Sequence, residues 1–313
     1  MKVKSSEYLT NTRPLLKKLL NRLLESFSYA SILAVDSEAY QYRVSKTVTF
    51  MGEDDLLCNR GFVIKVYDGN AYGEYSFNDI SEEKIEDIVS MVKSVVALKE
   101  SVNGMTLSQY KQLEDEPCTF CESTDYEIAP EDMGDEAILA KLTEIKDDAL
   151  LYDKKILNAT VGLSTQKYSK LFLSPNRDME QNVMWACGML MVDAKKDAVV
   201  KYSFKGFSNL GGIEIMRDIR DGIGHVGKNT LELLEASPIE PGEYDCICTP
   251  EVTGMIAHEA FGHGVEMDMF VKDRALAKSY VGKDVAAPIL TMHDGANMAC
   301  EHEVASYFFD DEG

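Results

Sequence analysis

The apolar residues near the start of the chain follow a helical period. Between residues 14 and 27 leucines recur every three or four positions, and lysine, asparagine and arginine occupy the opposite side. Thr12 and Pro14 supply typical helix start signals just before this stripe. An amphipathic helix with its apolar stripe against a core is therefore expected here.

The next fifty residues favour strands. Four runs are rich in aromatic and β-branched side chains: residues 29–35, 40–50, 61–67 and 71–77. Asp68-Gly69-Asn70 between the last two runs predicts a hairpin turn. A further apolar stripe from Ile85 to Val96, preceded by a Ser81 cap, predicts another helix. Residues 1–100 are thus predicted to form an α+β domain around an antiparallel sheet.

The middle of the chain predicts a second α+β unit. Residues 101–133 are polar and acidic, with few periodic apolar residues, and are interpreted as a linker or surface excursion. A helix is expected over 134–151. Three strands follow near residues 155–163, 182–192 and 198–204. This second unit would extend over residues 134–236.

A third unit is expected from residue 237. Ser237 to Gly242 is rich in proline and glycine and gives the clearest linker signal in the chain. Glu243 to Cys248 alternates like a strand, and Thr249-Pro250-Glu251 combines a cap, a proline and an acid at a helix start. This helix would run from Pro250 to about Gly262, and a strand is expected over 288–292. The overall class is therefore α+β.

Charge and composition narrow the range of partners. The net charge of −21 argues against direct nucleic-acid binding, which depends on Lys and Arg, and against adsorption to anionic membranes. No run of 18 apolar residues and no signal peptide is recognised. The odd number of cysteines, seven, favours a reducing cytoplasmic setting. The isolated pair Cys118 and Cys121 lacks the partners of a zinc site, while Cys246 and Cys248 are interpreted as packing residues.

A glycine-rich stretch resembles a phosphate loop only superficially. Residues 222–228 have the required glycine and lysine spacing, but Asn229 stands where a Ser or Thr would hold magnesium. The preceding residues are heavily charged, whereas a phosphate loop follows a buried apolar strand. The glycines are instead expected to form a loop, with Asn229 capping the short helix that follows.

Catalytic side chains are concentrated in one place. His258 and His263 are two of only five histidines, and Glu259 follows the first of them. Imidazole suits zinc, and a glutamate beside a zinc-activated water can act as a base. A spacing of five residues, however, separates the rings by about 140° on an ideal helix. Because Gly262 and Gly264 flank the second histidine, we expect the helix to distort or end there.

The sequence His258-Glu259-Ala260-Phe261-Gly262-His263-Gly264-Val265-Glu266 resembles the motif of the TldD/PmbA metallopeptidases, specifically of the catalytic TldD type. One position departs from the usual pattern, since Met267 replaces a glycine before Asp268. Pro241-Gly242 and Asp310-Asp311-Glu312-Gly313 also look like family landmarks. The resemblance is specific from about residue 235 to residue 313 and only architectural upstream of it.

The resemblance implies a zinc site with defined roles. His258 and His263 would bind Zn²⁺, and Glu259 would be the general base. Glu266 and Asp268 would be carboxylates that orient the imidazoles. The family's third ligand is a cysteine that would lie beyond Gly313. Alternatives within the chain are His293, Cys300 and His302.

The resemblance also implies substrates and partners. The expected substrates are peptides or unfolded polypeptides, and the expected assembly is a homodimer or a heterodimer with a non-catalytic PmbA-like subunit. The family's older label, modulator of DNA gyrase, would imply a nucleic-acid or topoisomerase partner, but the charge of −21 disfavours direct DNA binding.

Residues 237–313 look like an incomplete catalytic metallopeptidase domain. With two imidazoles and no family cysteine, the chain is expected to hold its metal weakly and to be inactive on its own. The alternative is a non-catalytic assembly or substrate-binding fragment of a TldD/PmbA-type complex.

Overall fold

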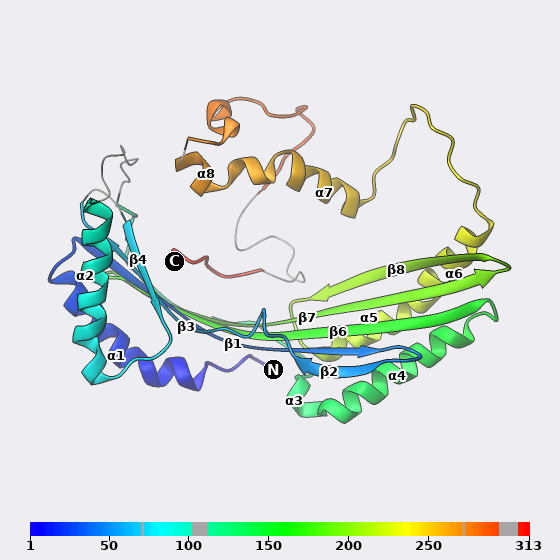
Figure 1. The fold of residues 1–313 in the computed structure, drawn as a ribbon, viewed down its shortest axis with the longest axis horizontal. Helices are drawn as coiled ribbons and strands as arrows, with labels where there is room; N and C mark the ends of the chain where they lie inside the picture. The colour runs from blue at the N-terminus through cyan, green and yellow to red at the C-terminus, as the bar shows by residue number, and fades with distance from the viewer. Residues whose placement is uncertain (70–71, 102–111, 272, 294–305) are drawn as a thin grey trace.

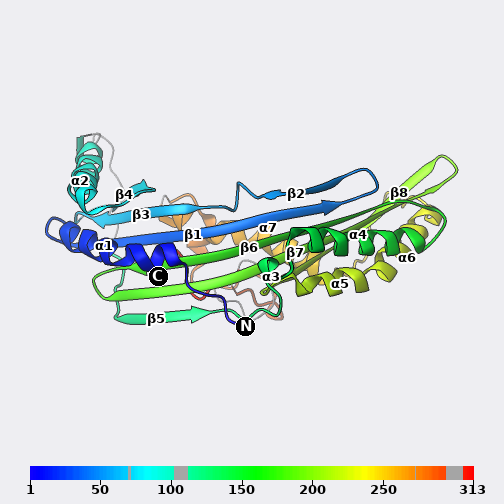
Figure 2. The ribbon, with the colours of Figure 1, turned by 90° about the horizontal axis from the view of Figure 1, so that it is seen from below.

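A computed structural model describes residues 1–69, 72–101, 112–271, 273–293 and 306–313. Its main feature is a long, curved sheet with helices against one face (Figure 1 and Figure 2). The strands are β1 (Tyr29–Val44), β2 (Thr49–Glu53), β3 (Arg60–Tyr67), β4 (Tyr72–Phe77), β5 (Cys118–Ser123), β6 (Ile156–Leu173), β7 (Arg177–Lys196) and β8 (Val199–Asn209). The α-helices are α1 (Glu7–Leu24), α2 (Ile85–Ser101), α3 (Pro130–Met133), α4 (Asp135–Leu151), α5 (Met216–Asp221), α6 (Ile223–Glu235), α7 (Pro250–Ala260) and α8 (Met267–Val271). Short 3₁₀ turns are η1 (Glu82–Lys84), η2 (Ile213–Ile215), η3 (Gly262–Val265) and η4 (Leu276–Tyr280).

One sheet joins the strands of the two predicted α+β units. Its order is β4-β3-β1-β6-β7-β5, with β2 also paired to β1 and β8 to β7. The long strand β1 makes the connection, because it pairs antiparallel with β2 and β3 on one edge and with β6 on the other. Only β5 joins in parallel, beside β7. The α+β class is confirmed, whereas the boundaries at residues 100, 133 and 236 stay predictions.

Two apolar clusters fill the helix-covered face of the sheet. The first packs α1 and α2 on β1, β3 and β6, and the second packs α4, α5 and α6 on β1, β6 and β7. The expected helical stripes point inward, with Leu16, Leu19 and Leu23 fully buried on α1. The expected strands near 155–163, 182–192 and 198–204 lie within β6, β7 and β8, which are longer. None of the described helices combines the length and apolarity needed to cross a bilayer.

Some predicted elements differ from the structure at their first or last residues. Helix α1 begins at Glu7 rather than near Thr12, because the Ser6 hydroxyl accepts the Leu9 N–H at 3.1 Å and caps it. Pro14 therefore lies inside the helix, where packing of the leucine stripe offsets its cost. The predicted β3–β4 hairpin is confirmed by antiparallel pairing, although Asn70 of its turn is outside the described residues.

Larger differences occur in segments that were expected to be loops or strands. The glycine-rich stretch belongs to helix α6, so Asn229 is an interior residue and not a cap, and its Nδ2 lies 3.0 Å from His225 Nε2. Part of the predicted linker, residues 118–123, forms β5 within the sheet. Residues 243–248 and 288–292, predicted as strands, carry no strand in the structure.

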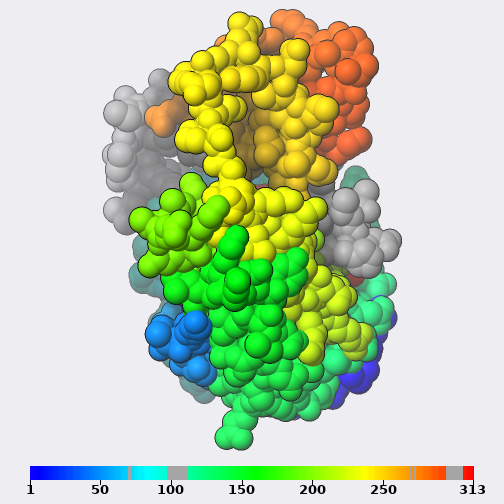
Figure 3. All heavy atoms as spheres, turned by 90° about the vertical axis from the view of Figure 1, so that its right-hand side faces the viewer, coloured from blue at the N-terminus to red at the C-terminus, as the bar shows by residue number. Residues whose placement is uncertain are grey.

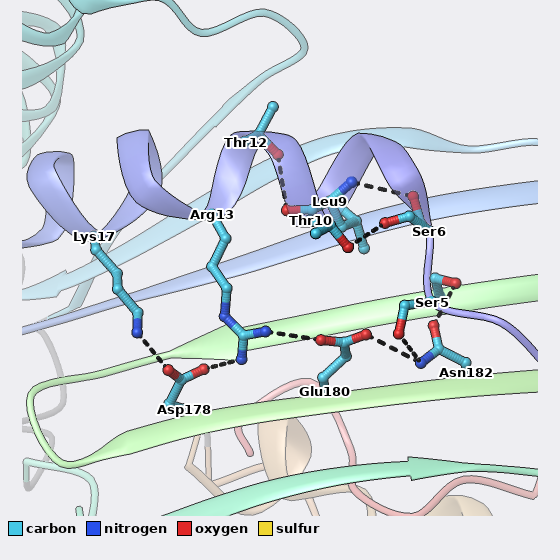
Figure 4. A network of polar contacts seen from close by, with 11 residues as sticks. Ser5, Ser6, Leu9, Thr10, Thr12, Arg13, Lys17, Asp178, Glu180 and Asn182 are labelled. Carbon is cyan, nitrogen blue, oxygen red and sulfur yellow. Dashed lines mark hydrogen bonds and ion pairs between the residues drawn. The ribbon is translucent and has the colours of Figure 1, made fainter.

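Charged residues fasten α1 to β7 (Figure 4). Arg13 donates to Asp178 and, at 2.8 Å, to Glu180, while Lys17 Nζ lies 2.6 Å from Asp178. Burial by itself raises the pKa of Asp178, but the hydrogen bonds from Arg13 and Lys17 outweigh it and hold that pKa below its usual value. The network therefore stabilises the helix position while these carboxylates are ionised.

The segment 306–313 lies on the face of the sheet opposite the helices (Figure 1). The N–H groups of Phe308 and Phe309 donate to Gln181 Oε1 at 2.8 and 3.2 Å. Lys170 Nζ donates to Asp311 Oδ1 at 2.6 Å. Because Lys170 and Gln181 are buried polar side chains of the sheet, this segment supplies the partners that their burial requires.

Candidate metal centre

The candidate metal-binding motif lies on a helix that ends just before the first glycine of that motif. Pro250 occupies the first turn of α7, and the N–H of Phe261 still bonds to the Ala257 carbonyl at 3.1 Å. Phe261 then leaves helical geometry, with φ −140° and ψ −32°, and the chain continues as η3. The distortion expected at His263 is confirmed, and it rotates this histidine away from its position on an ideal helix.

This break brings the two predicted metal ligands and the predicted base together. One ligand atom from each of His258, Glu259 and His263 lies within 4.8 Å of the others. The two imidazole rings have centroids 4.4 Å apart and planes inclined by 64°. Two imidazole nitrogens are donors that suit zinc, and the neighbouring carboxylate is close enough to act on a metal-bound water, so these residues fit the metal that the motif implies. Metal binding itself stays a prediction.

Glu266 contacts the second histidine. Its Oε1 lies 2.7 Å from His263 Nδ1, a contact that leaves Nε2 free to coordinate a metal. The hydrogen bond to Glu266, followed by the charges of Glu266 and Glu259, raises the pKa of His263 above its usual value. This is the contact that the predicted orienting role of Glu266 requires.

The remaining candidates are an acid on α8, the predicted base and three possible third ligands. Asp268 belongs to α8, directly after the motif, and its orienting role stays a prediction. Glu259 is exposed and has no cationic partner among the residues that the structure describes, as expected for a base that faces substrate. His293 is exposed, whereas Cys300 and His302 are outside the described residues.

The helix that carries the motif is fully accessible. Residues 237–249 leave α6 as an extended segment that stands away from the sheet and leads into α7 (Figure 1 and Figure 3). No residue of α7 is buried, and Val252, Met255 and Ile256 expose about half of their surface or more. Because α7 buries none of its residues, the helix break and the contacts of η3 with α8 and η4 set the arrangement of the histidines.

The cysteines outside the motif do not extend the site. Cys246 and Cys248 are exposed, so the prediction that they are packing residues is wrong. Cys118 and Cys121 lie three residues apart on β5, and an odd spacing places their side chains on opposite faces of a strand. Cys118 packs near Phe172, whereas Cys121 is exposed.

Sequence reasoning missed two polar residues of the sheet, Lys170 and Gln181, that hold the segment 306–313. The available signal was a lysine and a glutamine inside long strand-forming runs. Their partners are more than 120 residues away, so the signal did not reveal what they bind.

Comparisons with known proteins agree with the motif. Residues 241–313 match the family model described as the PmbA/TldA metallopeptidase C-terminal domain. A metalloprotease of Methanocaldococcus jannaschii is 25% identical over 304 residues, which cover 94% of this chain and 63% of that protein. A zinc metalloprotease TldD homologue of Saccharolobus solfataricus is 31% identical over 126 residues, covering 40% and 28%.

The fold also has a solved counterpart. A Thermotoga maritima protein described as a candidate modulator of DNA gyrase superposes with a TM-score of 0.54 at 13% identity, covering 72% of this chain and 50% of that one. At this identity the likeness concerns the fold alone. This chain spans less than two thirds of the length of each of these three proteins.

Proposed function

Because this chain belongs to the PmbA/TldD family, we propose that it carries the metal-binding helix of a zinc-dependent peptidase of the TldD type. The observation that carries the proposal is the convergence of His258, Glu259 and His263 at the helix break. Relatives that are named metalloproteases support it. In this proposal the two histidines bind zinc, and a cysteine C-terminal to Gly313, implied by the family resemblance, completes the site.

The residues of the chain have separate chemical tasks. Zinc supplies Lewis-acid activation of water and of the scissile carbonyl. A carboxylate oxygen of Glu259 takes the proton from the attacking water and delivers it to the leaving amine nitrogen. Glu266 holds the His263 ring by its Nδ1, so that Nε2 would be available to bind the metal.

Peptides or unfolded polypeptides are the proposed substrates, since an extended chain can reach an exposed helix end without prior unfolding. The proposed assembly is a homodimer or a heterodimer with a PmbA-like subunit, in the cytoplasm. A topoisomerase partner would follow from the description of the Thermotoga neighbour. The net charge of −21 favours polypeptide over DNA as the direct ligand.

The 313-residue chain alone is proposed to be inactive. Catalytic zinc sites usually have three protein ligands, and the motif supplies two imidazoles. The alternative function, a non-catalytic assembly or substrate-binding unit, is favoured by one observation, the absence of any buried residue on α7. Such a helix has surface available for a partner.

The test compares the 313-residue chain with a version extended through the rest of the family domain. In the extended protein, Glu259→Gln should keep stoichiometric zinc and lose about 10²–10⁴-fold in the hydrolysis of an unstructured peptide. Glu251→Gln is the matched control, because Glu251 is exposed on the same helix but lies outside the ligand cluster. If both variants turn over equally, Glu259 is not the base.

Metal analysis separates the two candidate functions. Zinc should leave the 313-residue chain on dialysis at neutral pH and remain in the extended protein. One zinc that survives dialysis of the shorter chain would show that His293, Cys300, His302 or Glu266 completes the site. An extended protein without zinc or hydrolysis would favour the non-catalytic alternative.

A further inference from the structure

A cavity of about 360 Å³ is lined by residues of β1, β6, β7 and the turn between α3 and α4, on the helix-covered face of the sheet. It is on the opposite face from α7 and the metal motif (Figure 1). The residues that argue for a ligand are three carboxylates, two tyrosines and one threonine: Glu38, Glu131, Asp135, Tyr40, Tyr42 and Thr165.

The cavity carries uncompensated negative charge. Glu131 faces Lys167, with Oε1 and Nζ 3.7 Å apart, so this pair is nearly neutral. Glu38 and Asp135 make no ion pair within the described part of the chain. Two carboxylates thus remain for a cation, and the net charge of −21 raises the concentration of cations around the protein.

A hydroxyl in the wall of the cavity is available to a ligand. Thr165 is 4% exposed as a residue and lines the cavity, yet its side chain makes no hydrogen bond to any residue that the structure describes. Its oxygen can therefore accept a hydrogen bond from a ligand with N–H donors. This observation is independent of the carboxylates and points to the same kind of ligand.

The tyrosines define how the cation would be held. Tyr42 donates its hydroxyl hydrogen to Asp135 Oδ1 at 2.7 Å and so orients that carboxylate. Burial, followed by this hydrogen bond, raises the pKa of Tyr42 well above its usual value, so the phenol stays protonated and donating. Tyr40 is half-buried beside it and offers an aromatic surface to a cation.

A metal ion fits this cavity less well than an organic cation. Among the described residues, the acidic side chains of the cavity do not form a close group of ligand atoms, whereas His258, Glu259 and His263 do. Calcium and magnesium need several oxygens within about 2–2.6 Å of one centre. Separated carboxylates, aromatic surface and a hydroxyl acceptor suit an ammonium group on an alkyl chain.

We propose that this cavity binds an alkylammonium group. The lysine side chain of a polypeptide and a free polyamine present the same chemistry, with a charged nitrogen that donates to the carboxylates and to Thr165. The proposal concerns binding and does not depend on peptidase activity.

Calorimetric titration of the 313-residue chain tests the proposal with three probes: N-acetyl-lysine methylamide, spermidine and N-acetyl-norleucine methylamide. The two ammonium compounds should bind and the norleucine compound should not, because it has the alkyl chain without the charge. Tighter binding of the lysine compound would identify a polypeptide as the source, and tighter binding of spermidine a polyamine. Equal heats from all three compounds, or from none, would overturn the proposal.

Variants locate the binding to the cavity. Glu38→Gln should weaken ammonium binding about threefold, as expected for one partly exposed ion pair, and Glu38→Gln with Asp135→Asn about tenfold. Thr165→Val should also weaken it, because its shape is kept while the acceptor is lost. Glu136→Gln is the matched control, since Glu136 is exposed beside Asp135 but does not line the cavity. If the double variant binds as tightly as this control, the ammonium site is elsewhere.

Discussion

Replacing Asp311 by asparagine should release the segment 306–313 from the sheet. Lys170 is 1% exposed on β6, and its Nζ lies 2.6 Å from Asp311 Oδ1 and 4.5 Å from the centre of the Tyr307 ring. The Asp311 carboxylate is itself 70% exposed. Asparagine would keep the size of the side chain and remove the only ionic partner of Lys170 among the described residues.

The magnitudes make release competitive with retention. Removing one partner of a buried ion pair costs about 3–5 kcal/mol, and the exposure of Asp311 places the cost near the lower end of that range. Release loses the burial of Phe309, worth about 2 kcal/mol, and the two hydrogen bonds to Gln181, worth about 0.5–1.5 kcal/mol each. Once the segment leaves, water can solvate the ammonium group of Lys170 and the amide of Gln181. A substantial share of the Asp311→Asn molecules should therefore have the segment released.

The fluorescence of Trp185, the single tryptophan of the chain, should report the release of the segment 306–313. Its ring lies 5.1 Å from the Tyr307 ring, and the residue is 5% exposed. Asp311→Asn should shift its fluorescence emission to longer wavelength. Asp310→Asn is the matched control, because the Asp310 side chain accepts the Glu312 N–H and makes no ion pair with the residues that the structure describes.

A second substitution, at Lys170, should reverse the effect of Asp311→Asn. Lys170→Met should leave the emission unchanged, because a buried ion pair can often be replaced by apolar groups at little cost. Lys170→Met combined with Asp311→Asn should restore the wild-type emission. The reasoning is refuted if Asp311→Asn alone emits like the wild type, or if Lys170→Met releases the segment.

Two further predictions concern stability, measured by urea unfolding. Arg13→Met should cost about 1.5–3 kcal/mol, because it breaks charge-assisted bonds between α1 and β7 (Figure 4), while Lys17→Met, at an exposed pair, should cost at most about 1 kcal/mol. Because the folded pKa of Asp178 is lowered, the Arg13 contribution should be complete above about pH 4 and fade below it, so wild type and variant should converge in acid. Gly188→Ala should cost about 1–3 kcal/mol, since a Cβ there would lie 2.4 Å from an isoleucine side chain of α5. Gly206→Ala, which meets nothing within 4 Å, should be nearly neutral, and equal costs at the two glycines would contradict the overpacking argument.

The elements predicted correctly from the sequence are those that local periodicity determines. The leucine stripe of α1 and the helix α4 follow directly from side-chain spacing, and the break after α7 follows from two glycines beside a histidine. Only the second half of α6 was predicted, because the glycines of its first half indicate a loop. Val226, Thr230 and Leu234 of α6 are buried, and this packing outweighs a cost of about 1 kcal/mol per glycine.

Strand predictions failed where pairing was missing. Polar and apolar residues alternate over 243–248 as in a strand, yet this alternation indicates only which face of a strand could be buried. A strand also needs a neighbour for its backbone groups, and this segment extends away from the sheet (Figure 3). By contrast, β5 lies in a polar, acidic stretch and forms because the edge of β7 is available for parallel pairing.

The distinction between features set by neighbouring residues and features set by distant ones also applies to the candidate metal centre. The approach of His258 to His263 depends on fewer than ten consecutive residues, so the motif alone is enough to predict two ligands and a base. Affinity for zinc depends in addition on a third ligand and on packing that restrains the helix, and both involve distant parts of a chain. The segment 306–313 illustrates such dependence, because its contacts with Lys170 and Gln181 connect residues more than 120 positions apart. Zinc affinity should therefore respond to changes outside the motif, whereas the relative placement of the two imidazoles should not.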